Sequence, residues 1–310
     1  MVFNSIPFLI FFSVVFVSFY LLSSKYRWIL LLVGSYFFYM CWEPAYILLI
    51  LLSTSIDYFV TQAIPVSRSR KKRQLLIISI ITNLGILFLF KYFNFFSESV
   101  NTLFGRFHLS PQLPILDVIL PVGISFYTFQ TLSYTIDVYR KKLKAEENFI
   151  SFATYVSFFP QLVAGPIERA TNLLPQFSVK KTFDYGLAKS GLQLMLWGFF
   201  KKIVIADNCA VFANAIFNNH LEYSWHSLIL GALFFTFQIY GDFSGYSDIA
   251  IGTARLFGFK LKRNFAFPYF SRDIAEFWRR WHISLSTWFR DYLYIPLGGS
   301  RGSTVKKIRN

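Results

Sequence analysis

Long apolar runs without a charged side chain constrain this chain more than any other feature of its sequence. A helix needs about 20 mainly apolar residues to cross the hydrocarbon core of a bilayer. About eight segments meet or approach this length, at positions 6–22, 28–42, 45–56, 74–90, 113–136, 149–167, 186–206 and 225–240. The third is short and follows Glu43 and Pro44, so it either tilts or does not cross fully. We therefore expect an all-α, polytopic integral membrane protein whose residues 1–310 form a single membrane domain.

The charge of the chain supports a lipid environment. Only 15% of the residues are charged, against roughly 25% in soluble domains, and the mean hydropathy is +0.45. The 31 Lys and Arg residues outnumber the 16 Asp and Glu residues, but they form short clusters between the apolar runs. This pattern excludes a soluble enzyme, a disordered chain and a disulfide-stapled secreted domain, and it argues against nucleic acid as a partner. We expect the lipid bilayer to surround the chain.

The basic clusters also predict an orientation, because Lys and Arg accumulate in cytoplasmic loops. If the cluster at 68–73 is cytoplasmic and segment 45–56 crosses, alternation places Lys25, Arg27 and the cluster at 140–144 on the same side. The N-terminus and the loop at 91–114 then lie outside.

A metal site is not expected. The two cysteines, Cys41 and Cys209, lie among apolar residues without a partner at metal-ligand spacing, so we expect both to be buried packing residues. The histidines are scattered along the chain and have no partnering carboxylates; they are His108, His220, His226 and His282.

Polar residues gather in the second half of the chain, and the region 271–291 is predicted to form one amphipathic helix. Ser271 is a plausible N-cap, and acidic residues follow in the first turns. His282 lies at the edge between an aromatic face and a face of arginines. A neutral imidazole there could take a proton from a hydroxyl group, while arginines hold an anionic acyl donor. The alternative is an interfacial helix whose arginines face lipid phosphates, and the helix taken alone favours that alternative.

Charged residues also interrupt the apolar run at 186–206 and follow the one at 225–240. Lys201 and Lys202 could be functional, but a helix that ends near Phe200 would let both reach the headgroup zone, and we favour this interpretation. Asp242 and Asp248, with Ser244 between them, could line a funnel or cap a following helix, and the sequence leaves both options open.

Four stretches of this chain resemble the membrane-bound O-acyltransferase superfamily, in its alginate O-acetyltransferase-like branch. The most specific is FPYFSRDIAEFWRRWHISLSTWFRDYLYIPLGG at 267–299. The others are LPVGISFYTFQTLSYTIDVYR at 120–140, FFPQLVAGPIERATNLLPQF at 158–177 and YGDFSGYSDIAIGTARLFGF at 240–259. They follow one another in the order that the family uses.

The resemblance implies helices around a funnel in the bacterial inner membrane. It implies transfer of an acyl group, acetyl in the similar proteins of this branch, from a cytoplasmic thioester such as acetyl-CoA, with no permanently bound cofactor. The acceptor would be an extracytoplasmic polysaccharide or a relay partner, and a separate acyltransferase or SGNH-like protein would assist. His282 matches the first of two signature histidines and would be catalytic. The residues expected to bind substrate or line the funnel are Arg279, Arg280, Ser286, Asp242 and Asp248.

The second signature histidine, which the family carries further on in a Trp-His-Gly context, has no counterpart in this sequence. The pair Trp225 and His226 is a superficial match, because Ser227 follows it and it precedes His282. We therefore interpret the sequence as a C-terminally truncated piece of a longer enzyme. The alternatives are a transporter or flippase of lipid-linked glycans, which would move its substrate without acyl transfer, and a non-catalytic membrane scaffold.

Overall fold

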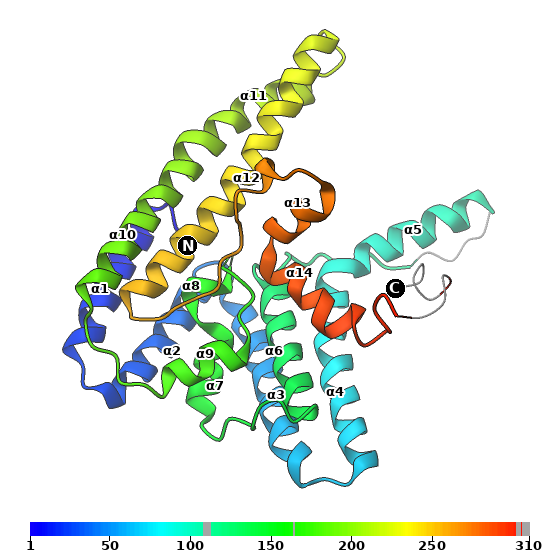
Figure 1. Ribbon diagram of the computed structural model, residues 1–310. Helices are drawn as coiled ribbons and strands as arrows, with labels where there is room; N and C mark the ends of the chain where they lie inside the picture. The colour runs from blue at the N-terminus through cyan, green and yellow to red at the C-terminus, as the bar shows by residue number, and fades with distance from the viewer. Residues whose placement is uncertain (108–112, 164, 302–304, 306–310) are drawn as a thin grey trace.

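The computed structural model describes residues 1–107, 113–163, 165–301 and 305, and it shows helices but no strand among them (Figure 1). His108 and most of the basic run at 301–309 lie outside the described residues. The helices, with 3-10 and π turns labelled η, are α1 Ile6–Leu21, α2 Ser24–Met40, η1 Pro44–Tyr46, α3 Ile47–Val66, α4 Ser69–Leu87, η2 Phe88–Tyr92, α5 Phe93–Arg106, α6 Ile124–Tyr139, α7 Phe149–Ser157, α8 Phe159–Leu162, α9 Ala170–Phe177, α10 Tyr185–Phe199, η3 Phe200–Ala206, α11 Asp207–Asn218, α12 Trp225–Leu256, η4 Pro268–Phe270, α13 Ile274–Arg280, α14 Ile283–Phe289 and η5 Arg290–Tyr294.

Three of the described helices are long and apolar enough to cross a membrane: Pro44–Val66, Ser69–Arg106 and Trp225–Leu256. Two shorter apolar helices, Ile6–Leu21 and Phe149–Leu162, accompany them. The expected all-α membrane fold is confirmed, although fewer helices reach spanning length than the eight predicted segments. The doubtful third segment belongs to the first of the long helices and is long enough to cross.

Segment 113–136 differs from the prediction, because its helix begins only at Ile124. Before it, residues 113–120 have no regular secondary structure and run beside α5. The side-chain amide of Asn94 donates to the Leu116 carbonyl at 2.8 Å, and its oxygen accepts from the Leu116 N–H at 2.9 Å. Asn101 bonds Leu113 in the same two ways. These amides satisfy backbone groups that a helix would otherwise satisfy itself.

Helices α10 and α12 pack closely because glycines face each other at two levels. A Cβ atom on Gly198 would lie 2.7 Å from the Gly245 carbonyl oxygen, and one on Gly252 would lie 2.6 Å from the Gly191 carbonyl oxygen. Small residues allow membrane helices to approach until their backbones touch. This contact fixes the faces of α10 and α12 that carry the charged residues of the second half.

A polar cluster holds α3, α4 and α6 together. The fully buried Asp57 of α3 accepts hydrogen bonds from Ser79, from Asn83 at 2.8 Å and from Thr135 at 3.3 Å. The Asn83 oxygen in turn accepts from Ser53 at 2.7 Å. Buried polar groups of this kind stabilise a helix contact only when they are paired with one another, as they are here.

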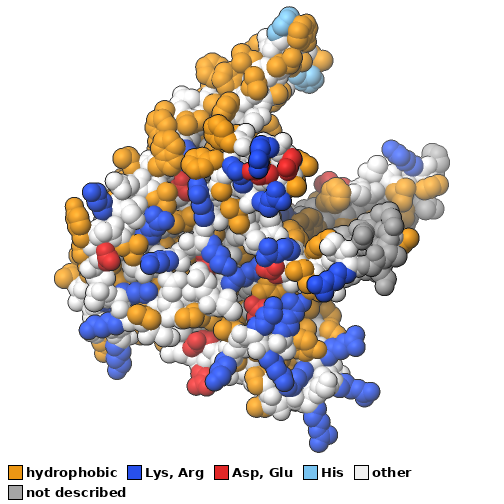
Figure 2. Space-filling model, in the orientation of Figure 1, with side chains coloured by type: hydrophobic (Ala, Val, Ile, Leu, Met, Phe, Trp, Pro, Cys, Tyr) orange, Lys and Arg blue, Asp and Glu red, His pale blue; other side chains and the backbone are white. Residues whose placement is uncertain are grey.

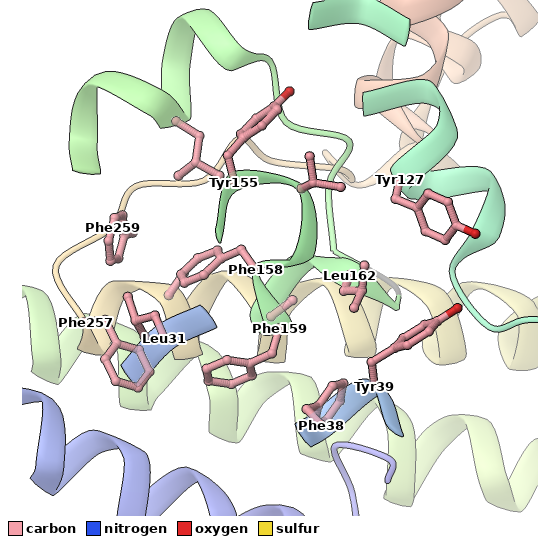
Figure 3. Close-up of a cluster of buried hydrophobic side chains, with 14 of the residues drawn as sticks. Leu31, Phe38, Tyr39, Tyr127, Tyr155, Phe158, Phe159, Leu162, Phe257 and Phe259 are labelled. Atoms are coloured by element: carbon pink, nitrogen blue, oxygen red, sulfur yellow. The ribbon is translucent and has the colours of Figure 1, made fainter. Parts of the chain in front are cut away.

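Aromatic side chains fill the space between α2, α8 and the end of α12 (Figure 3). The rings of Phe158 and Phe259 lie 5.0 Å apart, and Phe159 meets Phe257 edge to face at 5.9 Å. Phe38 of α2 packs against Phe159 from the other side. The core therefore anchors the short helix α8, which precedes a segment of the candidate site.

The basic loops lie toward one end of the bundle. The Arg27 guanidinium donates to the Lys181 carbonyl at 2.5 Å, and Gln62 of α3 donates to the Glu146 carbonyl at 2.6 Å. Figure 2 shows many Lys and Arg side chains over the lower half of the visible face. The sidedness of this end stays a prediction. Cys41, the C-cap residue of α2, is exposed, so its expected burial is wrong, and Cys209 is half-buried.

Candidate active site

His282 lies at a sharp bend between α13 and α14 and not inside a helix. Its backbone is left-handed, with φ of 42°, so the predicted single helix over 271–291 is wrong. The segment 264–266 causes the break by bonding the backbone on both sides of it. The Ile283 N–H donates to the Asn264 carbonyl, and the Ala266 N–H donates to the Arg280 carbonyl, both at 2.9 Å. The N-cap is Asp273, two residues beyond Ser271, and it accepts from the Glu276 N–H at 2.6 Å.

Buried side chains hold this bend in place. Asn264 is fully buried, and its side-chain oxygen accepts from the Ser284 hydroxyl at 2.6 Å. Its amide donates to Ser247 of α12 at 3.0 Å. The Ser284 hydroxyl also accepts from the Ile167 N–H at 3.0 Å. A left-handed conformation in a non-glycine residue costs about 1–3 kcal/mol, and these bonds from α12 and from the segment after α8 offset it.

The His282 imidazole occupies an aromatic environment. Phe243 of α12 meets it edge to face at 4.7 Å between centroids, and Phe126 and Phe265 lie farther away. Its Nδ1 atom is buried and forms no hydrogen bond with the described residues. Burial lowers the pKa of His282 to about 4. The imidazole is therefore neutral at physiological pH, and no described residue forms a hydrogen bond with its Nδ1 atom.

Two of the neighbouring predicted residues, Arg280 and Ser286, form hydrogen bonds within the α13–α14 segment. Arg280 donates to Glu276 at 2.5 Å, and Arg272 bonds the same carboxylate with its backbone N–H and its guanidinium. The hydrogen bonds from Arg272 and then the charge of Arg280 lower the pKa of Glu276 to about 2. Arg279 is exposed, and the Ser286 hydroxyl donates to the Trp281 carbonyl at 3.3 Å. Arg280 therefore forms an ion pair with Glu276 within α13.

Lys201 and Lys202 do not lie at a helix end, so the helix end expected near Phe200 is wrong. The helix continues from α10 through the π turn η3 into α11. Lys201 is 5% exposed, and its Nζ lies 2.5 Å from Asp248 Oδ2 and also bonds Ser244. Lys202 pairs with Asp242 at 2.5 Å and with Asp207 at 2.7 Å.

Asp242 and Asp248 lie inside α12, so they do not cap a following helix. Asp248 instead lines a cavity of 340 Å³ between α10, α12 and the segment after α12, which we call the α10–α12 cavity. Lys201 and Ser244 line it together with Tyr240 and Phe265. Because Phe265 also packs near His282, this cavity adjoins the bend.

A second cavity of 340 Å³, the basic cavity, lies on α14 and was missed from the sequence. Its charged lining residues are Asp137, Lys142, Arg169, Lys262, Arg263, Arg290 and Asp291. Ile283 and Ser284, which directly follow His282, also line it. The adjacent pair Glu168 and Arg169 after the Gly165 and Pro166 break was the available signal, because such charges rarely lie buried in a membrane protein without a function. No group of three or more His, Cys, Asp or Glu side chains suited to a metal occurs within the described ranges.

Comparison with known proteins assigns the chain to a family. The model of the MBOAT, membrane-bound O-acyltransferase family matches residues 140–310. The protein named "Probable alginate O-acetylase AlgI" from Pseudomonas aeruginosa is 45% identical over 316 residues, covering 100% of this chain and 60% of that protein. The "Peptidoglycan O-acetyltransferase" of Helicobacter pylori is 38% identical, covering 90% of this chain and 57% of that protein. The "Teichoic acid D-alanyltransferase" of Bacillus subtilis is 31% identical over 61% of this chain and 48% of its own length. The chain spans about 60% of the length of the first of these relatives. This chain belongs to the membrane-bound O-acyltransferase family.

Proposed function

We propose that this chain carries part of an integral-membrane O-acyltransferase of the bacterial inner membrane. It passes an acetyl group from acetyl-CoA on the cytoplasmic side to hydroxyl groups of an extracytoplasmic polysaccharide or of a relay partner. The observation that carries the proposal is the neutral His282, held in a strained bend by buried hydrogen bonds. Relatives named for acetyl transfer to alginate and to peptidoglycan support the acyl group and the acceptor class.

The chemistry needs one proton acceptor beside an apolar site. A ring nitrogen of His282 takes the proton from the acceptor hydroxyl while its oxygen attacks the thioester carbonyl. The carbon–sulfur bond then breaks, the thiolate leaves and the imidazolium returns the proton to it. The products are an O-acetyl ester and free coenzyme A, so no proton is gained or lost overall. Phe243 and its neighbours keep bulk water from competing with the hydroxyl.

The alternatives make different predictions in one assay. Membrane vesicles would contain the protein expressed from its complete reading frame and a separate SGNH-like partner, with radiolabelled acetyl-CoA on the cytoplasmic face and alginate on the other. We expect ester-linked label on the alginate. Alginate that crosses the membrane without label supports a transporter instead, and neither label nor movement supports a scaffold.

The orientation has its own test. Ser69 and Thr102 lie near opposite ends of the long helix Ser69–Arg106. With the N-terminus outside, a reporter fused at Ser69 should be cytoplasmic and one at Thr102 external. The same sidedness at both positions would refute this orientation.

A further inference from the structure

Arg169 is a buried cation whose side chain is not satisfied by the fold. It is 7% exposed, and neither Nη1 nor Nη2 forms a hydrogen bond with a described residue. Its nearest carboxylate oxygen belongs to Asp291, 3.6 Å from Nη2, and that carboxylate already accepts from Arg290 at 2.8 Å. Buried polar groups are nearly always hydrogen-bonded, so a buried guanidinium with two nitrogens that form no hydrogen bond indicates a ligand that is an anion.

The backbone around Arg169 is firmly held, so the guanidinium cannot simply move to water. The neighbouring Glu168 is fully buried and accepts from the Lys262 N–H and from Asn172 at 2.6 Å. The Tyr292 ring lies 4.4 Å from the Arg169 guanidinium carbon and covers one face of it. The planar fork is therefore fixed with its edge available in the basic cavity.

The rest of the basic cavity is suited to a multiply charged anion. Arg169 and four further cations, Lys142, Lys262, Arg263 and Arg290, face two carboxylates, which leaves an excess of three positive charges. One of the carboxylates, Asp137, already accepts from the Tyr292 hydroxyl at 2.6 Å. Guanidinium groups bind phosphate oxygens in pairs, so the lining matches phosphate esters better than a single carboxylate.

The cavity connects the basic end of the bundle to the bend. Lys142 belongs to the basic cluster after α6, whereas Ile283 follows His282 directly in the chain. A molecule that places its phosphate groups against Arg169 therefore has room for its uncharged part beside Ile283, the residue that follows His282. The arginines first expected to hold the donor do not share this position, because Arg280 is paired with Glu276 and neither it nor Arg279 lines the cavity.

We propose that the basic cavity binds the phosphate groups of the acyl thioester donor, with Arg169 as their buried anchor. This inference rests on the proposed function, since it places the donor of that reaction. The ligand class is a phosphate ester of pantetheine, of which coenzyme A carries several phosphate groups and a carrier-bound pantetheine carries one. The excess of positive charge favours coenzyme A.

Binding of coenzyme A to the purified protein in nanodiscs tests the assignment without requiring catalysis. Equilibrium dialysis would compare wild type with Arg169→Gln, and with Arg70→Gln as a matched loss of one exposed arginine outside the cavity. We expect Kd to rise about tenfold in Arg169→Gln, to recover partly in Arg169→Lys and to stay within about twofold in Arg70→Gln. Inorganic pyrophosphate should displace coenzyme A, and pantetheine without phosphate should not. Unchanged binding in Arg169→Gln overturns the assignment.

The rim provides a second route if Arg169→Gln does not fold. Lys142 and Arg290 are exposed, so Lys142→Gln and Arg290→Gln should fold. Each variant should bind coenzyme A more weakly than wild type, and its affinity should depend less on the salt concentration. Binding that neither variant changes overturns the proposal. The outcome is separable from the proposed function. Coenzyme A bound through Arg169 without acetyl transfer contradicts the function alone, whereas transfer with an unchanged KM in Arg169→Gln contradicts the cavity alone.

Discussion

The pair of Lys201 and Asp248 should be the most costly charge pair to break in this protein. Their side chains are 6% and 18% exposed, and the two charges lie 2.5 Å apart between α10 and α12. Asp248→Asn removes the negative charge and leaves the ammonium with Ser244 and the Tyr240 ring. Breaking a buried pair by removing one partner costs about 3–5 kcal/mol, and the partial exposure of Asp248 favours the lower end, about 3 kcal/mol.

The second pair on the same helices is a matched control. The side chains of Lys202 and Asp242 are 15% and 33% exposed, and Lys202 keeps Asp207 as another partner. Asp242→Asn should therefore cost about 1 kcal/mol or less. Replacing both partners of the buried pair, in Lys201→Met with Asp248→Leu, should restore stability to within about 1 kcal/mol of wild type, because no unpaired charge then remains.

The measurement is the free energy of unfolding in detergent micelles, from tryptophan fluorescence as the mole fraction of dodecyl sulfate increases. A double-mutant cycle gives the coupling between Lys201 and Asp248, which should be about 2 kcal/mol or more. If Asp248→Asn costs no more than Asp242→Asn, the charges of this region are not paired as described. The reasoning would then fail for both pairs.

Three further outcomes follow from other contacts. Gly245→Val would place a side chain against the Gly198 carbonyl oxygen and should lower the free energy of unfolding by about 1–3 kcal/mol. Gly85→Val, where an added Cβ meets nothing within 4 Å, should lower it by less. Equal losses in the two variants would contradict the close approach of α10 and α12. Asn264→Leu should lower the rate of acetyl transfer more than the affinity for coenzyme A, because it frees the bend at His282 and Ser284 but changes none of the charged residues that line the basic cavity. A change in affinity alone would contradict that role. The lowered pKa of His282 makes the folded state prefer the neutral ring. Its contribution to the free energy of unfolding is therefore complete above pH 6.5 and is lost as the pH falls toward 4. Between pH 7 and 5 the wild type should lose about 2 kcal/mol relative to His282→Gln, and parallel curves would contradict the shift.

The sequence predicted the membrane class because hydrophobicity along the chain is a local property. It also predicted an aromatic face beside His282, but the rings that meet the imidazole are Phe243, Phe126 and Phe265, which come from outside residues 271–291. The left-handed bend was not predictable from periodicity, because Asn264 and Ser284 impose it through contacts across the fold. Residues 271–291 by themselves have an uninterrupted helical pattern.

Long-range pairing explains the other differences as well. A lysine within an apolar run indicates a helix end unless a carboxylate on a neighbouring helix pairs with it. Only the packing of α10 against α12 shows that Asp248 pairs with Lys201. The sequence did not single out Arg169, because its burial depends on Tyr292 and on the segment that holds Lys262. The resemblance to the family indicated which histidine to examine, but it did not indicate these partners.

The central claim is that His282 accepts the proton of the acyl acceptor. The most direct measurement compares acetyl transfer from acetyl-CoA by wild type and by His282→Gln, in the protein expressed from its complete reading frame, with coenzyme A binding measured on the same samples. Loss of a general base lowers a rate by about 100-fold to 10,000-fold. We predict a fall in kcat within that range with the affinity for coenzyme A unchanged. A kcat equal to that of wild type would contradict a chemical role for His282.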